Sequence, residues 1–67
     1  MSVYKVIELI GTSEVSWEDA AKTAIERAAK TLEELRIAEV IEQDCKIEDG
    51  TITQYRTKVR LSFRFRE

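Results

Sequence analysis

The chain contains no proline and no histidine, and its 67 residues include one cysteine and two glycines. A single cysteine excludes an internal disulfide, and a chain without histidine has no Cys/His zinc cluster. A domain of this size buries only about 60% of the surface that its unfolded chain exposes, so such domains usually need disulfides, a metal or partner subunits. We therefore expect residues 1–67 to form one self-associating domain.

The same absences argue against catalysis. Without histidine the chain lacks the side chain that most often acts as a general base near neutral pH. For the same reason Cys45 has no histidine to activate its thiol as a nucleophile. Gly11 and Gly50 stand alone, so there is no glycine-rich phosphate loop. We expect a protein that is not an enzyme.

Charge and hydropathy are balanced. Charged residues make up 36% of the chain and hydrophobic residues 43%, with a net charge of −2, which is typical of a folded protein and gives little support for nucleic-acid binding. No apolar run approaches the ~20 residues of a membrane span. Lys5 and Glu8 lie where a signal peptide would be apolar. We expect a cytoplasmic protein with no nucleic-acid or membrane partner.

The first half of the chain predicts a strand and a helix. Residues 3–10 are apolar and rich in β-branched side chains on both faces, which is typical of a strand covered on both sides, and residues 11–13 predict a turn. Ser16 is a helix cap, and the alanine-rich stripe that follows predicts a helix reaching Glu34, about 19 residues or ~28 Å long.

The second half predicts a long hairpin. Residues 36–47 and 51–66 alternate in character around Asp49-Gly50, a strong turn signal. With Glu48 opposite Thr51, paired residue numbers sum to 99. The apolar face then carries Ala38, Val40, Val59 and Leu61, and the other face has Ile37, Glu39, Ile41 and Gln43 opposite Ser62, Arg60, Lys58 and Arg56.

These elements predict an α+β fold of order β-α-β-β, in which one helix packs on a three-stranded antiparallel sheet and the first strand lies beside the third. Sixteen residues of extended chain would span ~50 Å. The hairpin should therefore project past the helix, and its tip would be bare unless another subunit covers it.

Glu42 and Asp44 are the candidate metal ligands. As next-but-one neighbours in a strand, they project from one face with their carboxylates about 7 Å apart, and hard oxygen ligands suit calcium. The alternative is that both are solvated surface charges.

Three other features each have two interpretations. The basic row of the last strand resembles a phosphate-binding stripe, but Glu8 and Glu39 are available for ion pairs, which we favour; the row is Arg56, Lys58, Arg60, Arg64 and Arg66. Cys45, expected to share a face with Gln43 and Gln54, is either a surface or interface residue or a redox group. Trp17 is a core or subunit contact, or a platform for a ligand.

The order and spacing of these segments resemble the dodecin family. The resemblance covers nearly the whole chain, and the segments that carry it are residues 4–13, the alanine-rich helix ending at residues 28–32, residues 38–40, Asp49-Gly50 and residues 59–63. It implies a hollow homododecamer of cubic symmetry that stores or sequesters small ligands without turning them over.

Flavin-binding dodecins stack paired flavins on a tryptophan at the start of the second strand and hold the polar edge of the flavin with a glutamine on the third. Here Ile37 and Arg56 occupy those two positions. Isoleucine has no flat π face, and arginine only donates hydrogen bonds. The sequence is therefore more similar to dodecins associated with calcium than to those that bind FMN or riboflavin. A flavin-binding dodecin with an altered pocket and a purely structural assembly protein remain the alternatives.

Overall fold

The computed structural model describes residues 1–65 and has the predicted order β-α-β-β. Strand β1 (Tyr4–Ser13) leads to helix α1 (Trp17–Ala29), and strands β2 (Leu35–Glu48) and β3 (Thr51–Arg64) form the hairpin. The sheet is antiparallel with the order β1-β3-β2, so β1 lies beside β3 as expected. Arg66, which we had included in the last strand and the basic row, lies outside the described residues.

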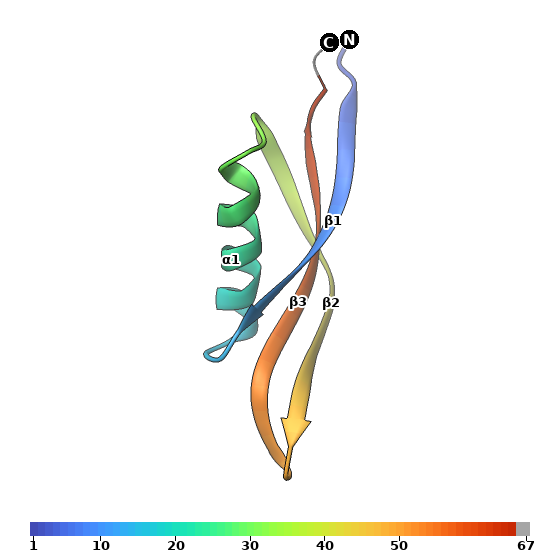
Figure 1. Ribbon diagram of the computed structural model, residues 1–67. Coiled ribbons are helices and arrows are strands. Elements are labelled where there is room, and N and C mark those ends of the chain that lie inside the picture. The colour runs from blue at the N-terminus through green and yellow to red at the C-terminus, as the bar shows by residue number, and fades with distance from the viewer. Residues whose placement is uncertain (66–67) are drawn as a thin grey trace.

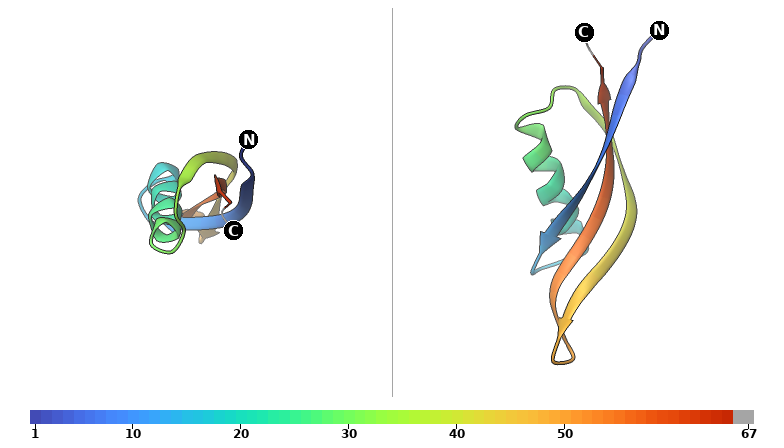
Figure 2. Two further views of the ribbon diagram at one scale, coloured as in Figure 1. Left: turned by 90° about the horizontal axis from the view of Figure 1, so that it is seen from above. Right: turned by 45° about the vertical axis from the view of Figure 1, so that its right-hand side comes forward.

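The molecule is elongated, and the hairpin extends well beyond the helix. Its principal extents are 51 × 20 × 14 Å. Figure 1 shows the β2–β3 turn projecting past the N-terminal end of α1, with the start of β1 and the end of β3 at the opposite end of the sheet. Figure 2 shows α1 on one side of the strongly twisted sheet. No helix within residues 1–65 is long and apolar enough to cross a bilayer.

The small core lies between α1 and the strands β1 and β3. The predicted alanine stripe is the buried face of the helix, at Ala20, Ala24 and Ala28, and it packs against Val59 and Leu61 of β3. Ser16 caps the helix, accepting a hydrogen bond from the backbone N–H of Asp19 at 3.0 Å.

The predicted apolar face of the hairpin is only half covered. Val59 and Leu61 are at most 1% exposed, whereas Val40 is 53% exposed and Ala38 is exposed as well. The reason is the position of α1, which packs on β1 and β3 and touches β2 only slightly.

Two predicted boundaries were wrong. The predicted turn at residues 11–13 belongs to β1, because Gly11 lets the backbone of α1 approach the strand closely at Ala20. The helix ends at Ala29 rather than Glu34: the backbone N–H groups of Thr31 and Leu32 both bond to the Ala28 carbonyl, and Glu34 adopts a positive φ of 57° that turns the chain into β2.

Candidate functional site

The face of the sheet turned away from α1, called the outer face below, brings the candidate residues together. Buried Thr57, Val59 and Leu61 lie beneath the helix, so their neighbours along β3 point to the other side. The register assigns the following residues to the outer face: Tyr4, Val6, Glu8, Ile10 and Thr12 of β1; Arg56, Lys58, Arg60, Ser62 and Arg64 of β3; and Ile37, Glu39, Glu42 and Asp44 of β2.

A register shift between Val40 and Glu42 decides which side chains of β2 reach this face. The predicted pairs Ile37–Ser62 and Glu39–Arg60 are confirmed, but Ile41 is an extra residue in β2 and every pair from 42 to 46 is displaced by one. A second shift between Lys46 and Ile47 restores the predicted register at the turn. The predicted partners of Lys58 and Arg56, Ile41 and Gln43, were therefore wrong.

The shift turns Glu42 and Asp44 onto the outer face. In the predicted register these carboxylates would have followed Val40 onto the face beneath the helix. In the structure Glu42 pairs with Lys58 and Asp44 with Arg56. A bulge re-aims side chains in this way, and here it moves two carboxylates away from the apolar face and places them opposite two cations.

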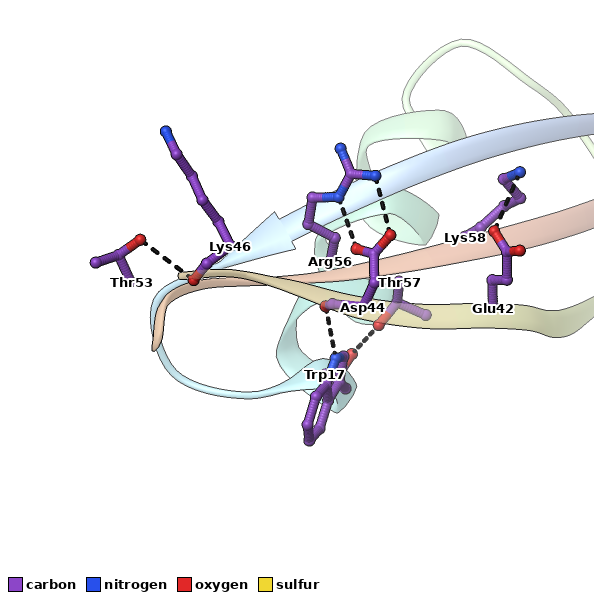
Figure 3. A network of polar contacts seen from close by, with 8 residues as sticks. All are labelled: Trp17, Glu42, Asp44, Lys46, Thr53, Arg56, Thr57 and Lys58. Carbon is purple, nitrogen blue, oxygen red and sulfur yellow. Dashed lines mark hydrogen bonds and ion pairs between the residues drawn. The ribbon is translucent and has the colours of Figure 1, made fainter. Parts of the chain in front are cut away.

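Asp44 and Arg56 form a two-pronged ion pair. Arg56 donates from Nε to Oδ1 of Asp44 at 2.7 Å and from Nη2 to Oδ2 at 3.1 Å (Figure 3). This hydrogen-bonded guanidinium lowers the pKa of the Asp44 carboxyl and raises the pKa of Arg56. Both oxygens of Asp44 are therefore engaged by one partner.

Two further sets of ion pairs lie beside this one. Lys58 Nζ lies 3.4 Å from Oε1 of Glu42, whose side chain is 65% exposed. Arg60 joins all three strands, because its Nη2 contacts Glu8 of β1 at 2.8 Å and its Nη1 contacts Glu39 of β2 at 3.3 Å. The predicted ion pairing of the basic row with Glu8 and Glu39 is thus confirmed at Arg60.

Trp17 ties the start of α1 to the other side of the hairpin. Its indole N–H donates to the carbonyl oxygen of Asp44 at 2.9 Å, and its ring meets Tyr55 edge to face, with ring centroids 4.9 Å apart. Figure 3 shows the Asp44–Arg56 and Glu42–Lys58 pairs on one side of the hairpin and Trp17 on the opposite side. Within the single chain, half-buried Trp17 therefore packs against the hairpin.

Cys45 has a different neighbour from the predicted one. The displaced register pairs it with Tyr55 rather than Gln54, on the side of the sheet that carries the helix, and it is a half-buried free thiol. A hollow near the hairpin tip is lined by Cys45, Lys46, Gln54 and Arg56.

Glu42 and Asp44 suit calcium in chemistry but not in number. Carboxylate oxygens are the ligands that calcium prefers, and it takes six to eight of them. Within residues 1–65, no group of three or more acidic or cysteine side chains is placed to hold a metal ion. One chain therefore provides part of a ligand set: Arg56 engages both oxygens of Asp44, whereas Lys58 contacts Oε1 of Glu42.

Comparison with known proteins places the fold in a defined group. The family model named Dodecin matches residues 3–66. The chain belongs to the dodecin family. It is 48% identical over 66 residues to calcium dodecin of Mycobacterium tuberculosis, covering 98% of this chain and 93% of that protein.

Two solved dodecin structures superpose closely on this chain. Dodecin from Streptomyces coelicolor has a TM-score of 0.94 at 35% identity, covering 98% of this chain and 94% of that one. The crystal structure of calcium dodecin from M. tuberculosis, described as having a novel calcium-binding site, has a TM-score of 0.86 at 50% identity and covers 97% and 93%.

Ile37 and Arg56, the two positions at which we expected a flavin pocket, lie far apart in one chain. Ile37 is 67% exposed on the outer face opposite Ser62, which is six residues along β3 from Arg56. Six residues of strand span about 20 Å. A single copy therefore does not bring Ile37 and Arg56 together, and a pocket that uses both positions needs a second copy.

Proposed function

We propose that this dodecin is a homododecameric binding and storage protein for small ligands or ions, that calcium is the ion it holds, and that its flavin binding is weakened or lost. The observation that carries the calcium proposal is the register shift that turns Glu42 and Asp44 onto the outer face. The 48% identity to a protein named calcium dodecin supports the same ion.

Assembly is supported by apolar side chains that one chain leaves uncovered. On the outer face, Tyr4, Val6, Ile10 and Ile37 are each 48–67% exposed. Exposed apolar side chains gathered on one face favour a contact surface, and the core of one subunit is small. Further copies would supply the second layer expected over β1.

Glu42 and Asp44 would hold calcium together with oxygens from another copy or from water. The bound ion would supply positive charge that links acidic side chains across a contact between copies. In one chain, Lys58 and Arg56 already neutralise the carboxylates of Glu42 and Asp44. We therefore expect the calcium affinity to depend on assembly.

Calorimetry on the metal-free oligomer tests the calcium assignment. The double variant E42Q/D44N should weaken calcium binding by about tenfold or more, since two charged ligands are lost. The matched control is E48Q, which removes an exposed carboxylate of the same hairpin that pairs with Lys46. Equal affinity for E42Q/D44N and E48Q would reject Glu42 and Asp44 as ligands.

Flavin storage with an altered pocket is the second candidate, because Ile37 is exposed at the position of the stacking residue. FMN fluorescence should stay unquenched at tens of micromolar wild-type protein and become quenched in I37W, which provides a flat ring. Strong quenching by the wild type would favour this candidate. No heat with calcium and no quenching with FMN would favour a purely structural shell.

A further inference from the structure

We propose that Arg56 is the residue that sets the calcium affinity of this chain, because its guanidinium is hydrogen-bonded to the Asp44 carboxylate that the ion would bind. This inference rests on the proposed function. Arg56 engages both oxygens of Asp44, at 2.7 and 3.1 Å, so Asp44 has no oxygen without a partner in this arrangement. A cation that binds both oxygens of Asp44 must therefore compete with the Arg56 guanidinium for them.

The neighbouring pair of Glu42 and Lys58 is held less tightly. Lys58 reaches one oxygen of Glu42 at 3.4 Å, and the carboxylate is 65% exposed. A forked guanidinium is a stronger and more directional partner for a carboxylate than an ammonium. Glu42 is thus accessible to an ion without rearrangement, whereas Asp44 is held by its own chain.

The backbone at Asp44 is also restrained from the other side of the hairpin. The Trp17 indole donates to the Asp44 carbonyl at 2.9 Å, and Thr57 in turn donates to the Trp17 carbonyl at 2.8 Å. Thr57 is fully buried. Because these two hydrogen bonds restrain the backbone at Asp44, we expect the exchange between Arg56 and an ion to occur by movement of the Arg56 side chain.

Calcium calorimetry on the metal-free oligomers of wild type, R56Q, D44N and R56Q/D44N tests this. R56Q should bind calcium at least about fivefold more tightly than wild type, and the gain should vanish in R56Q/D44N. K46Q is the matched control, since it removes one positive charge from the same hairpin without freeing Asp44. Equal gains in R56Q and K46Q would overturn the proposal.

The outcomes separate this inference from the proposed function. If wild type binds calcium and R56Q matches it, the Arg56 proposal fails and calcium storage stands. If only R56Q binds calcium, the Arg56 proposal holds and native calcium storage fails; if neither binds, both fail. Trp17 is the single tryptophan, so its emission should change on calcium addition wherever Asp44 is engaged.

Should R56Q fail to assemble, R56K keeps the charge and loses the fork. It should bind calcium more tightly than wild type, because an ammonium engages Asp44 less completely. Affinity equal to wild type in a correctly assembled R56K would contradict the proposal.

Discussion

Gly11 is the residue at which β1 and α1 come closest. A Cβ at this position would collide with the carbonyl oxygen of Ala20, lie 2.9 Å from its carbonyl carbon and meet the Ala24 side chain at 3.0 Å. The obstacle is largely backbone, which cannot rotate away. Gly50 differs, because a Cβ there meets nothing within 4 Å and the cost is its positive φ of 73°.

We expect G11A to lower the free energy of unfolding by about 1–3 kcal/mol or more, the typical result of overpacking. G50A should cost about 1 kcal/mol through backbone conformation alone. Urea unfolding at one fixed protein concentration measures both, since assembly contributes to the apparent stability. A smaller loss in G11A than in G50A would show that α1 can move away from β1.

At the scale of elements, Thr57 is the polar link between β3 and the start of α1. It is fully buried, and its hydroxyl donates to the Trp17 carbonyl at 2.8 Å. T57V removes that hydrogen bond with little change of shape, so the free energy of unfolding should fall by about 0.5–1.5 kcal/mol.

T53V is the control for T57V. It is the same substitution in the same strand at an exposed position, where the hydroxyl makes a longer contact of 3.4 Å to Lys46. Its free energy of unfolding should change by less than about 0.5 kcal/mol. Equal losses for the two variants, measured by urea unfolding, would mean that the buried Thr57 hydroxyl stabilises the fold no more than the exposed Thr53 hydroxyl.

Most elements could be predicted because their signals are local. The Ser16 cap, the alanine stripe and the Asp49-Gly50 turn each depend on a few adjacent residues, and all three were confirmed. The helix end could not be predicted, because Leu32 and Leu35 continue the apolar spacing although they pack from the loop and from β2.

The candidate site was predictable only in part. Strand geometry alone predicts that Glu42 and Asp44 share a face. It does not predict their cross-strand partners, because one extra residue in β2 changes every pairing from 42 to 46. The extra residue is Ile41, and neither a glycine nor another sequence signal marks a bulge there. The contact of Trp17 with Asp44 spans 27 residues, so no local pattern reveals it.

At the scale of the whole molecule, the hairpin tip is a second apolar surface that one chain leaves uncovered. Ile47 and Ile52 pair across β2 and β3 beyond the reach of α1, and their side chains are 63% and 45% exposed. Their position on a long unsupported arm suits a contact between copies.

We expect the double variant I47K/I52K to shift the protein toward smaller species in light scattering coupled to gel filtration. Two charges at an apolar contact would have to be buried without partners. T51K, which adds a charge at an exposed polar position of the same tip, should leave the mass unchanged. If I47K/I52K still formed an assembly of wild-type mass, Ile47 and Ile52 would not lie in a contact between copies.

Two of the three register shifts of the hairpin compensate each other in length. The shift after Val40 adds a residue to β2 and the shift after Lys46 adds a residue to β3, so the pairing from Ile37 to Val40 has the same register as the pairing at the turn and differs only between them. Deleting either extra residue alone would put the far end of the hairpin out of step, whereas losing both would shorten each arm by one residue with every pair retained. The lengths of the two arms are thus free to vary only as a pair, and a lineage that loses Ile41 should also have lost a residue at position 53.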